Sequence, residues 1–197
     1  MSDPATLRFY AKNASAYADH ATEPTGAPLT AFLAALPAQA RILELGCGNG
    51  RDAAHMLACG FDVEPTDGTP ELAAEAQRRL GRPVGILRFE ELEAFGRYHG
   101  IWACASLLHV EAAQLTAILA RIRRALKPSG VFCASFKAGK GEGRDSLGRY
   151  YNYPSPGTLR ASYGEAGWSD VAFVEQEGSG YDGKPTTWLW VTATRQP

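Results

Sequence analysis

The sequence predicts a single α/β domain in which helices cover both faces of a mostly parallel sheet. Apolar strand segments alternate with helical segments along most of the chain, and two parallel strands need a long crossover, usually a helix, between them. The strand segments are apolar, as expected for strands that are buried on both faces. The 197 residues suffice for one such domain and are too few for two ordinary enzyme domains. We therefore expect one domain over residues 1–197.

Two helices are expected before the first strand. Asp3 followed by Pro4 forms a good N-cap and first-turn pair, which predicts a helix over residues 4–21. Helical spacing on one side of this segment supports the prediction, with apolar or aromatic residues at Leu7, Tyr10, Ala14 and Tyr17. A second helix is predicted over residues 29–37, where Pro37 ends it.

Strict alternation begins at residue 41. Strands are predicted at residues 41–45, 61–66, 84–89, 100–106 and 130–136. Helices are predicted between them at residues 51–59, 70–80 and 111–127. The last of these has basic residues in its final turn and is followed by Pro128 and Gly130, which is a typical helix end.

The composition changes after Phe136. Residues 137–156 are rich in glycine, charge and tyrosine and show no period, so a long loop is expected there, and such loops are usually functional or disordered. A helix over residues 156–167 follows, and then come strands at 168–176 and 186–194. Because the connection between these last strands is short, we expect a C-terminal antiparallel hairpin.

Charge, cysteine usage and hydropathy exclude several classes of protein. The formal net charge is −1, which gives no general attraction to nucleic acid, so a nucleic-acid partner is not expected. The four cysteines are dispersed with no C-x-x-C pair and predict reduced thiols in a cytoplasmic protein. No segment resembles a secretion signal or is apolar for long enough to span a bilayer, so no membrane association is expected.

The segment "ILELGCGNGRDA" carries the main functional signal. A strand, a glycine-rich turn and a helix start form a ligand site at the carboxyl edge of a sheet, because glycines let the backbone approach a ligand. The dinucleotide fingerprint G-x-G-x-x-G is incomplete, since Arg51 stands where its third glycine belongs. No G-K-[ST] follows, which excludes a P-loop.

This segment resembles the first motif of class I S-adenosylmethionine-dependent methyltransferases. The resemblance implies S-adenosyl-L-methionine as cofactor, with its methionyl part held by the glycine turn, by Arg51 and by Glu44. The residues that it assigns to this part of the cofactor site are Glu44, Gly46, Cys47, Gly48 and Arg51. For Glu44, capping of loop amides at the strand end remains an alternative.

Four further segments resemble the same family. The resemblance places Asp67, with Gly68 beside it, on the ribose hydroxyls, and Glu90 near the adenine amine; a helix N-cap and a solvated acidic turn are the respective alternatives. It places Ala105 and Ser106 under the cofactor. The helix bearing Tyr10 and Tyr17 is expected to fold over the site as a lid, with plain packing as the alternative, so Tyr17 is assigned to the cofactor and Tyr10 to the acceptor.

The resemblance covers about residues 10–136 and is to small methyltransferases related to tellurite-resistance proteins. It implies a Rossmann-like methyltransferase fold, which is a doubly wound, mostly parallel seven-stranded sheet. Three parts are expected: a helical lid over residues 1–37, a cofactor-binding core over 38–136, and a substrate loop, helix and hairpin over 137–197.

Few catalytic groups are expected, because methyl transfer needs alignment and exclusion of water more than covalent chemistry. His109 is the candidate base, with a structural role as the alternative. Ser106 lacks the G-x-S-x-G context of a hydrolase. The histidines show no metal-ligand spacing, so no metal is expected.

The basic, tyrosine-containing loop suits a small polar or anionic acceptor. Arg144, Arg149 and Tyr150 are its candidate binding residues, although the arginines can instead pair with acids of the same loop. Two other functions stay open. These are a nicotinamide (NAD)-dependent oxidoreductase and a catalytically silent regulatory protein that binds S-adenosylmethionine.

Overall fold

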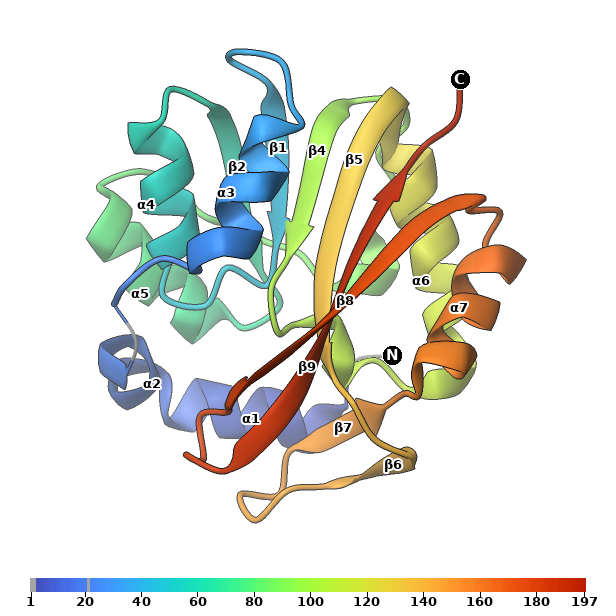
Figure 1. Cartoon of the computed structure of the whole chain (residues 1–197). Helices are drawn as coiled ribbons and strands as arrows, with labels where there is room; N and C mark the ends of the chain where they lie inside the picture. Colours follow the sequence, from blue (N-terminus) through green and yellow to red (C-terminus); the bar gives the residue numbers. More distant parts are fainter. Residues whose placement is uncertain (1–2, 21) are drawn as a thin grey trace.

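A seven-stranded sheet organises the protein, seen in a computed structural model that describes residues 3–20 and 22–197 (Figure 1). Across the sheet the strands are β3 (Gly85–Ile86), β2 (Asp62–Asp67), β1 (Arg41–Leu45), β4 (Tyr98–Ala103), β5 (Leu126–Lys137), β9 (Pro185–Thr194) and β8 (Asp170–Ser179). The first five are parallel, whereas β9 is antiparallel to both β5 and β8. The doubly wound, mostly parallel sheet with a C-terminal antiparallel hairpin is thus confirmed.

Apolar side chains project from both faces of the sheet, and each face has its own hydrophobic core. In β1, Ile42 packs with α3 (Gly26–Ala34) and α4 (Arg51–Ala58), while the next residue, Leu43, packs with α6 (Ala112–Ala125) and α7 (Pro156–Glu165). Neither residue is exposed at all. Successive strand residues point to opposite faces, so a strand buried on both sides must be apolar throughout.

Two helices lie across the carboxyl edge of the parallel strands, at the lower edge of the sheet in Figure 1. They are α1 (Pro4–Lys12) and α2 (Ala14–His20), and they pack on α5 (Pro70–Leu80) through Tyr10, Ala14 and Leu72. The expected continuous helix is wrong. Asn13 leaves the helical conformation, with a φ of −112° and a ψ of 17°, and its side chain donates to the carbonyl of Phe9 at 2.8 Å. Ala21, the last residue of the predicted helix, lies outside the described residues.

The third predicted strand is much shorter than expected. Only Gly85 and Ile86 pair with β2, and the chain then turns into a 3₁₀ helix, η1 (Phe89–Glu91). The side chain of Glu91 accepts from the backbone N–H of Arg88 at 3.0 Å, which favours this turn over continued pairing. Arg88 and Phe89 are thereby directed towards the site rather than along the sheet.

The ends of the two central strands also differ from the prediction. β4 stops at Ala103 because Ala105 has a φ of +49° and bonds to the Ser135 side chain instead of to a strand. The next turn of 3₁₀ helix is η2 (Leu107–His109). β5 begins four residues earlier than expected, at Leu126, and its pairing with β4 shifts register between Tyr98 and Gly100 to accommodate the extra residues.

The expected loop after β5 contains a small second sheet. β6 (Gly141–Arg144) pairs antiparallel with β7 (Tyr150–Tyr153). The glycines at positions 141 and 143 remove any alternation of apolar and polar residues, which explains why the sequence showed no strand period. In Figure 1 this hairpin lies beside α1, at the same edge of the molecule.

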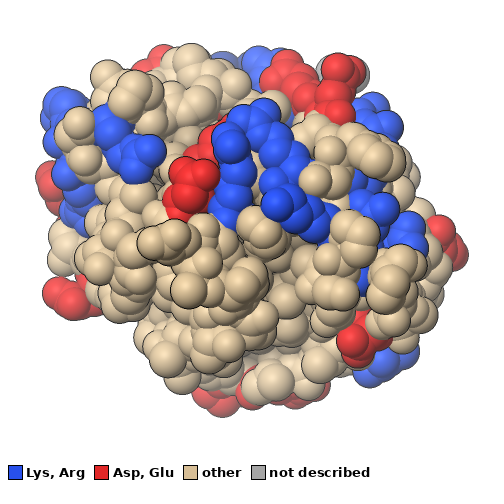
Figure 2. Space-filling view, turned by 90° about the horizontal axis from the view of Figure 1, so that it is seen from above, with Lys and Arg blue, Asp and Glu red and all other residues tan. Residues whose placement is uncertain are grey.

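The remaining helix bounds differ from the prediction by two or three residues at several ends, as is common for helix termini. Figure 2 views the opposite edge of the molecule, where lysine and arginine side chains gather among a few acidic ones. At this edge Arg41 and Arg97 both pair with Glu64, at 3.0 and 2.9 Å. Among the described residues, no helix is both long enough and apolar enough to cross a membrane.

Candidate functional site

The glycine turn after β1 is held in shape by its own hydrogen bonds. The N–H groups of Gly46 and Cys47 donate to the Thr66 carbonyl, and the Gly48 N–H donates to the Asp67 carboxylate at 3.0 Å. Gly46 has a φ of +74°, and a Cβ there would stand 2.5 Å from the Cβ of Ser106. Only glycine satisfies both the conformation and the close approach.

Asp67 ends β2 beside this turn. Its second oxygen accepts from the Thr69 N–H at 2.8 Å, so the carboxylate joins the glycine turn to the start of α5. Thr69 occupies the N-cap position of that helix. Burial outweighs these hydrogen bonds and raises the pKa of Asp67 to about 6. The group is therefore ionised at neutral pH and titrates within a mildly acidic range.

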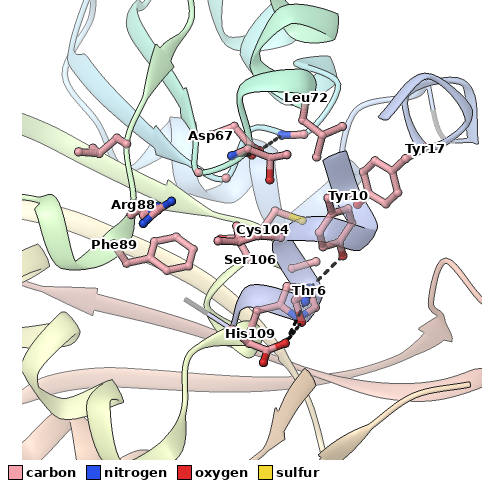
Figure 3. A pocket seen from close by; sticks show the side chains of 18 residues that line it. Thr6, Tyr10, Tyr17, Asp67, Leu72, Arg88, Phe89, Cys104, Ser106 and His109 are labelled. Carbon is pink, nitrogen blue, oxygen red and sulfur yellow. Dashed lines mark hydrogen bonds between the residues drawn. The ribbon is translucent and has the colours of Figure 1, made fainter. Parts of the chain in front are cut away.

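Asp67 lines a cavity that lies between the glycine turn, η1 and the helices α1 and α2; we call it the Asp67 cavity. In Figure 3, Arg88 and Phe89 lie on one side of it and Tyr10 and Tyr17 on the other. The cavity therefore offers a buried carboxylate between an aromatic side chain and two tyrosines. A nucleoside, with a flat base and vicinal hydroxyls, matches this set of groups.

A second cavity follows along the glycine turn, and we call it the Glu44 cavity. It is lined by Glu44, Arg51, Tyr17 and the end of the β8–β9 hairpin, including Tyr181. Glu44 is 2 % exposed, and its Oε2 atom has no hydrogen-bond partner among the described residues. Burial, with Asp52 and Asp67 nearby, raises the pKa of Glu44 well above its usual value. A cationic ligand group beside Glu44 would compensate this carboxyl.

The predicted cofactor residues gather at these two cavities, with one exception. The ten that line one or both of them are Tyr17, Glu44, Gly46, Cys47, Gly48, Arg51, Asp67, Gly68, Ala105 and Ser106. The exception is Glu90, which lies in η1 but is not among the lining residues of either cavity, whereas its neighbours Arg88 and Phe89 line the first.

The segment after β4 is fixed at the junction of the two cavities. The Ala105 N–H donates to Ser135 Oγ at 2.8 Å, and Ser106 Oγ donates to the Leu45 carbonyl at 2.7 Å. Cys104 and Ala105 line both cavities. Burial raises the pKa of the Cys104 thiol to about 11, so it stays protonated at neutral pH.

His109 is engaged through both ring nitrogens. Its Nδ1 lies 2.6 Å from the Tyr150 carbonyl, which only accepts, so Nδ1 carries the proton and Nε2 accepts from the Tyr10 hydroxyl at 2.9 Å. Burial lowers the pKa of His109 to about 4. The ring is neutral at neutral pH, and its basic nitrogen is occupied while Tyr10 is in place.

The predicted acceptor residues of the β6–β7 hairpin make contacts within the protein. Arg149 is 1 % exposed, bonds to Asp145 through Nε and Nη2, and donates from Nη1 to the Tyr10 hydroxyl at 3.0 Å. Arg144 forms a two-pronged ion pair with Asp3 at the start of α1. The Tyr150 hydroxyl donates to Glu142. Tyr10 lines the Asp67 cavity, but Arg144, Arg149 and Tyr150 line neither cavity.

Sequence reasoning missed several residues that shape the site. Asn49 donates to the Ala18 carbonyl at 2.7 Å and so holds α2 against the glycine turn. Tyr181 and Trp188 bring the terminal hairpin to the Glu44 cavity. Asn49 stands inside the glycine motif and so carried a usable signal, whereas the hairpin residues lie far from it in the sequence.

No group of three or more histidine, cysteine, aspartate or glutamate side chains in the described part of the chain is placed to hold a metal ion. The four cysteines are all free thiols.

Comparisons with known proteins agree with this geometry. Part of the chain is 36 % identical, over 117 residues, to the biotin biosynthesis bifunctional protein BioCD of Bordetella avium. Another comparison gives 28 % identity over 102 residues to an uncharacterized methyltransferase of Synechocystis. These matches cover 56 % and 51 % of this chain but only 24 % and 48 % of the relatives, so the chain spans less than half of each.

A solved structure has the same fold over nearly the whole chain. It is the 1,6-didemethyltoxoflavin-N1-methyltransferase of Burkholderia thailandensis, with a TM-score of 0.75 and 24 % identity, and the match covers 97 % of this chain and 85 % of that one. The methyltransferase domain model matches residues 17–169, from within α2 to just before β8. The chain therefore belongs to the methyltransferase domain family.

Proposed function

We propose that the protein transfers a methyl group from S-adenosyl-L-methionine to a small polar or anionic acceptor. The observation that carries the proposal is the pair of adjoining cavities along one glycine turn, each with a buried carboxyl group. Asp67 suits ribose hydroxyls, and Glu44 suits an ammonium group. The Burkholderia structure contains S-adenosylhomocysteine and 1,6-didemethyltoxoflavin, which supports the choice of cofactor and of a small-molecule acceptor.

The residues present fit each part of this cofactor. The nucleoside occupies the Asp67 cavity, with the base beside Phe89 and the ribose on Asp67. The methionyl part extends into the Glu44 cavity, where the unpartnered oxygen of Glu44 receives the ammonium group. The turn N–H groups of Gly46, Cys47 and Gly48 are already bonded within the protein, so Arg51 is the partner for the carboxylate.

The protein's own contribution is alignment and exclusion of water. The cofactor supplies an electrophilic methyl group on a sulfonium. Tyr17, which lines both cavities, closes the site together with Tyr10, and Asn49 ties α2, the helix of Tyr17, to the turn. Transfer to an acceptor needs no covalent intermediate on the enzyme. With its Nε2 held by Tyr10, His109 supports the lid, and a role as base would require that bond to open.

The occupied N–H groups of the glycine turn weigh against a dinucleotide. A pyrophosphate carries two negative charges and is normally bound by free backbone N–H groups at a helix start. Here the turn N–H groups of Gly46, Cys47 and Gly48 have internal acceptors, so they are not available to a pyrophosphate.

The proposal is tested by thermal unfolding with S-adenosylhomocysteine, with NAD, and with neither, for the wild type and Asp67→Ala. A ligand at about 100 times its Kd stabilises the native state by roughly 2.7 kcal/mol, which is a shift of several degrees for a domain of this size. We expect the shift with S-adenosylhomocysteine alone, and expect it to shrink or vanish in the variant. A shift with NAD alone would favour the oxidoreductase.

A catalytically silent regulatory protein would bind the cofactor equally well but would transfer no labelled methyl group to an acceptor, so a transfer assay distinguishes the two functions. The free thiols support a cytoplasmic location as part of this proposal. The kinship with tellurite-resistance-like methyltransferases also remains a proposal, based on the overall pattern of the sequence.

A further inference from the structure

We propose that a third cavity is the acceptor site and that its acceptor is a planar aromatic or heteroaromatic ring that reacts through a hydroxyl or N–H group. This inference rests on the proposed methyltransferase function. The third cavity lies between the connection that leads into α3 and the terminal hairpin. We call it the Trp190 cavity, since Trp190 lines it and lines neither of the other two.

All three cavities meet at one point. Cys104 and Ala105, just after β4, line the Asp67 cavity, the Glu44 cavity and the Trp190 cavity. If the first holds a nucleoside and the second an amino acid, the sulfur that joins them lies at this junction. The Trp190 cavity opens at the same junction and contains neither Asp67 nor Glu44, so the cofactor does not need it. It is positioned to bring an acceptor to the methyl group.

One wall of the Trp190 cavity consists of two indoles. Trp188 and Trp190 are two residues apart on β9, so both point to the same face of the sheet. Trp190 stacks on the buried Trp102, with ring centroids 5.5 Å apart and planes 26° from parallel. A Cβ at Gly178 would lie 3.1 Å from Trp188, which shows that this indole lies close against the β8 backbone. Both rings are thus held in place.

Short side chains line the cavity at the start of α3, where Gly26, Ala27 and Pro28 lie. A space lined by fixed indole rings and small residues favours a flat ring, because ring faces stack favourably at close range. A branched or flexible aliphatic acceptor would leave much of the indole surface without contact.

The polar groups of the cavity argue against a strongly charged acceptor. Among the described residues that line it, the one cation is Arg51, which donates to Thr25 at 3.3 Å and lies 3.8 Å from Asp52. Ser135 Oγ is committed to the Ala105 N–H and points its proton towards Cys104. Glu177, the one carboxylate among these described lining residues, accepts from Thr187 Oγ1 at 2.8 Å. A neutral ring is therefore preferred to a phosphate or an alkylammonium. This preference narrows the proposed class of small polar or anionic acceptors to polar, uncharged rings.

The reaction balances without a further reagent. The lone pair of the acceptor's oxygen or nitrogen forms the bond to the methyl carbon, the carbon–sulfur bond breaks, and its electron pair stays on sulfur as a thioether. The proton of the hydroxyl or N–H leaves to solvent water.

The test fills the Trp190 cavity without touching the other two. Gly26 lines only the Trp190 cavity, and a Cβ added there meets no atom within 4 Å. Gly26→Phe should therefore fold and obstruct the cavity. Gly164→Phe is the matched control, because Gly164 is also a helical glycine in open space and lines none of the three cavities. Trp190→Ala, which removes an indole that lines only the Trp190 cavity, is a second variant.

Calorimetry first measures whether the full chain binds S-adenosylhomocysteine. This binding decides whether the proposed function stands. Transfer of a radiolabelled methyl group is then measured for catechol, 3-hydroxypyridine, benzimidazole and uracil, and for the aliphatic acceptors ethanolamine, cysteamine and glycine. Saturation-transfer NMR on the S-adenosylhomocysteine complex detects which of these compounds bind.

We expect binding or transfer among the ring compounds only. Gly26→Phe should reduce it at least tenfold, and Trp190→Ala should weaken it. The activity of Gly164→Phe, and the Kd of S-adenosylhomocysteine in all three variants, should stay within twofold of wild type. The inference is overturned, with the proposed function intact, if S-adenosylhomocysteine binds but no ring compound binds or reacts. Preference for an aliphatic acceptor, or ring turnover that Gly26→Phe leaves unchanged, would overturn it as well.

Discussion

Tyr10 and His109, which are 99 positions apart in the sequence, share a hydrogen bond of 2.9 Å between the tyrosine hydroxyl and Nε2 (Figure 3). The direction of this bond is fixed at both ends. The Tyr150 carbonyl accepts a hydrogen bond from the Nδ1–H group of His109, and Arg149 donates to the Tyr10 oxygen. A continuous series of hydrogen bonds therefore joins α1, η2 and the β6–β7 hairpin.

His109 should remain neutral well below its usual pKa. Burial lowers that pKa to about 4, while the unfolded chain takes up a proton near pH 6.5, so protonation favours unfolding between these values. The contribution of His109 to stability is complete above pH 6.5 and is lost as the pH falls towards 4, by roughly 3 kcal/mol in total. Asp67, with its raised pKa, changes stability in the opposite direction over an overlapping range.

Urea unfolding of wild type and His109→Asn at pH 4.5 to 7.5 measures this effect. The titration of Asp67 contributes equally to both proteins, so it cancels in the difference between their free energies of unfolding. The difference in the free energy of unfolding should shrink as the pH falls. Nitrogen-15 NMR should show a protonated Nδ1 at pH 7. An imidazole that titrates near pH 6.5 in the folded protein would contradict the assignment.

Arg149 should be one of the residues on which stability depends most. It and Asp145 are buried together, with side chains 1 % and 5 % exposed. Arg149→Met leaves a buried carboxylate without its cation, which should destabilise the protein by about 3–5 kcal/mol. Adding Asp145→Asn should recover part of this loss, since it removes the unpaired charge.

Urea unfolding measures these effects. Exposed Arg8 on α1 provides the control, and Arg8→Met should change the free energy of unfolding by no more than about 0.5 kcal/mol. If Arg149→Met is as stable as wild type and only weakens acceptor binding, the residue belongs to the acceptor site instead.

Cofactor binding should weaken in mild acid. Asp67 has a pKa of about 6 in the free protein, and its ionised form is the better acceptor for ribose hydroxyls. Below that pH the proton must be displaced, so the Kd of S-adenosylhomocysteine should rise by up to tenfold per pH unit between pH 6 and 5. Calorimetry at pH 5.0, 6.0 and 7.5 measures this.

Asp67→Asn should bind more weakly at pH 7.5 and lose most of the pH dependence. Glu44 titrates nearby with a raised pKa, so the same series on Glu44→Gln separates the two carboxyls. A wild-type Kd that is constant from pH 7.5 to 5 would rule out an ionised Asp67 as the ribose partner.

Arg144 should control how often the lid opens. Its guanidinium bonds to both oxygens of Asp3, which in turn caps α1 through the Thr6 N–H. These hydrogen bonds hold the pKa of Asp3 well below its usual range. Arg144→Ala should raise amide exchange in α1 and the dissociation rate of S-adenosylhomocysteine severalfold.

Lys140→Ala, at an exposed position just before β6, is the matched control and should change neither rate. If Arg144→Ala instead changes the KM for the acceptor and leaves amide exchange in α1 unchanged, Arg144 is an acceptor-binding residue, as the sequence predicted.

The order of the sheet elements and the cofactor side of the site were predictable because their signals are local. Gly46, Gly48 and Asp67 follow buried strands, and parallel strands bring their carboxyl ends to one edge. Apolar strands with helices between them allow few other arrangements. The boundaries failed where a side chain competes with the backbone, as Asn13 does when it ends α1.

What the sequence by itself determined is the α/β fold, the glycine turn and the identity of the residues beside it. Tertiary structure decided what those residues can do. It left the Oε2 atom of Glu44 buried without a hydrogen-bond partner among the described residues and occupied both nitrogens of His109. It also made Arg144, an acceptor candidate, the partner of Asp3, 141 positions away. The physical reason is that strand period and turn chemistry depend on neighbours in the chain. Burial, protonation and hydrogen-bond partners depend on segments that meet only when the chain is folded.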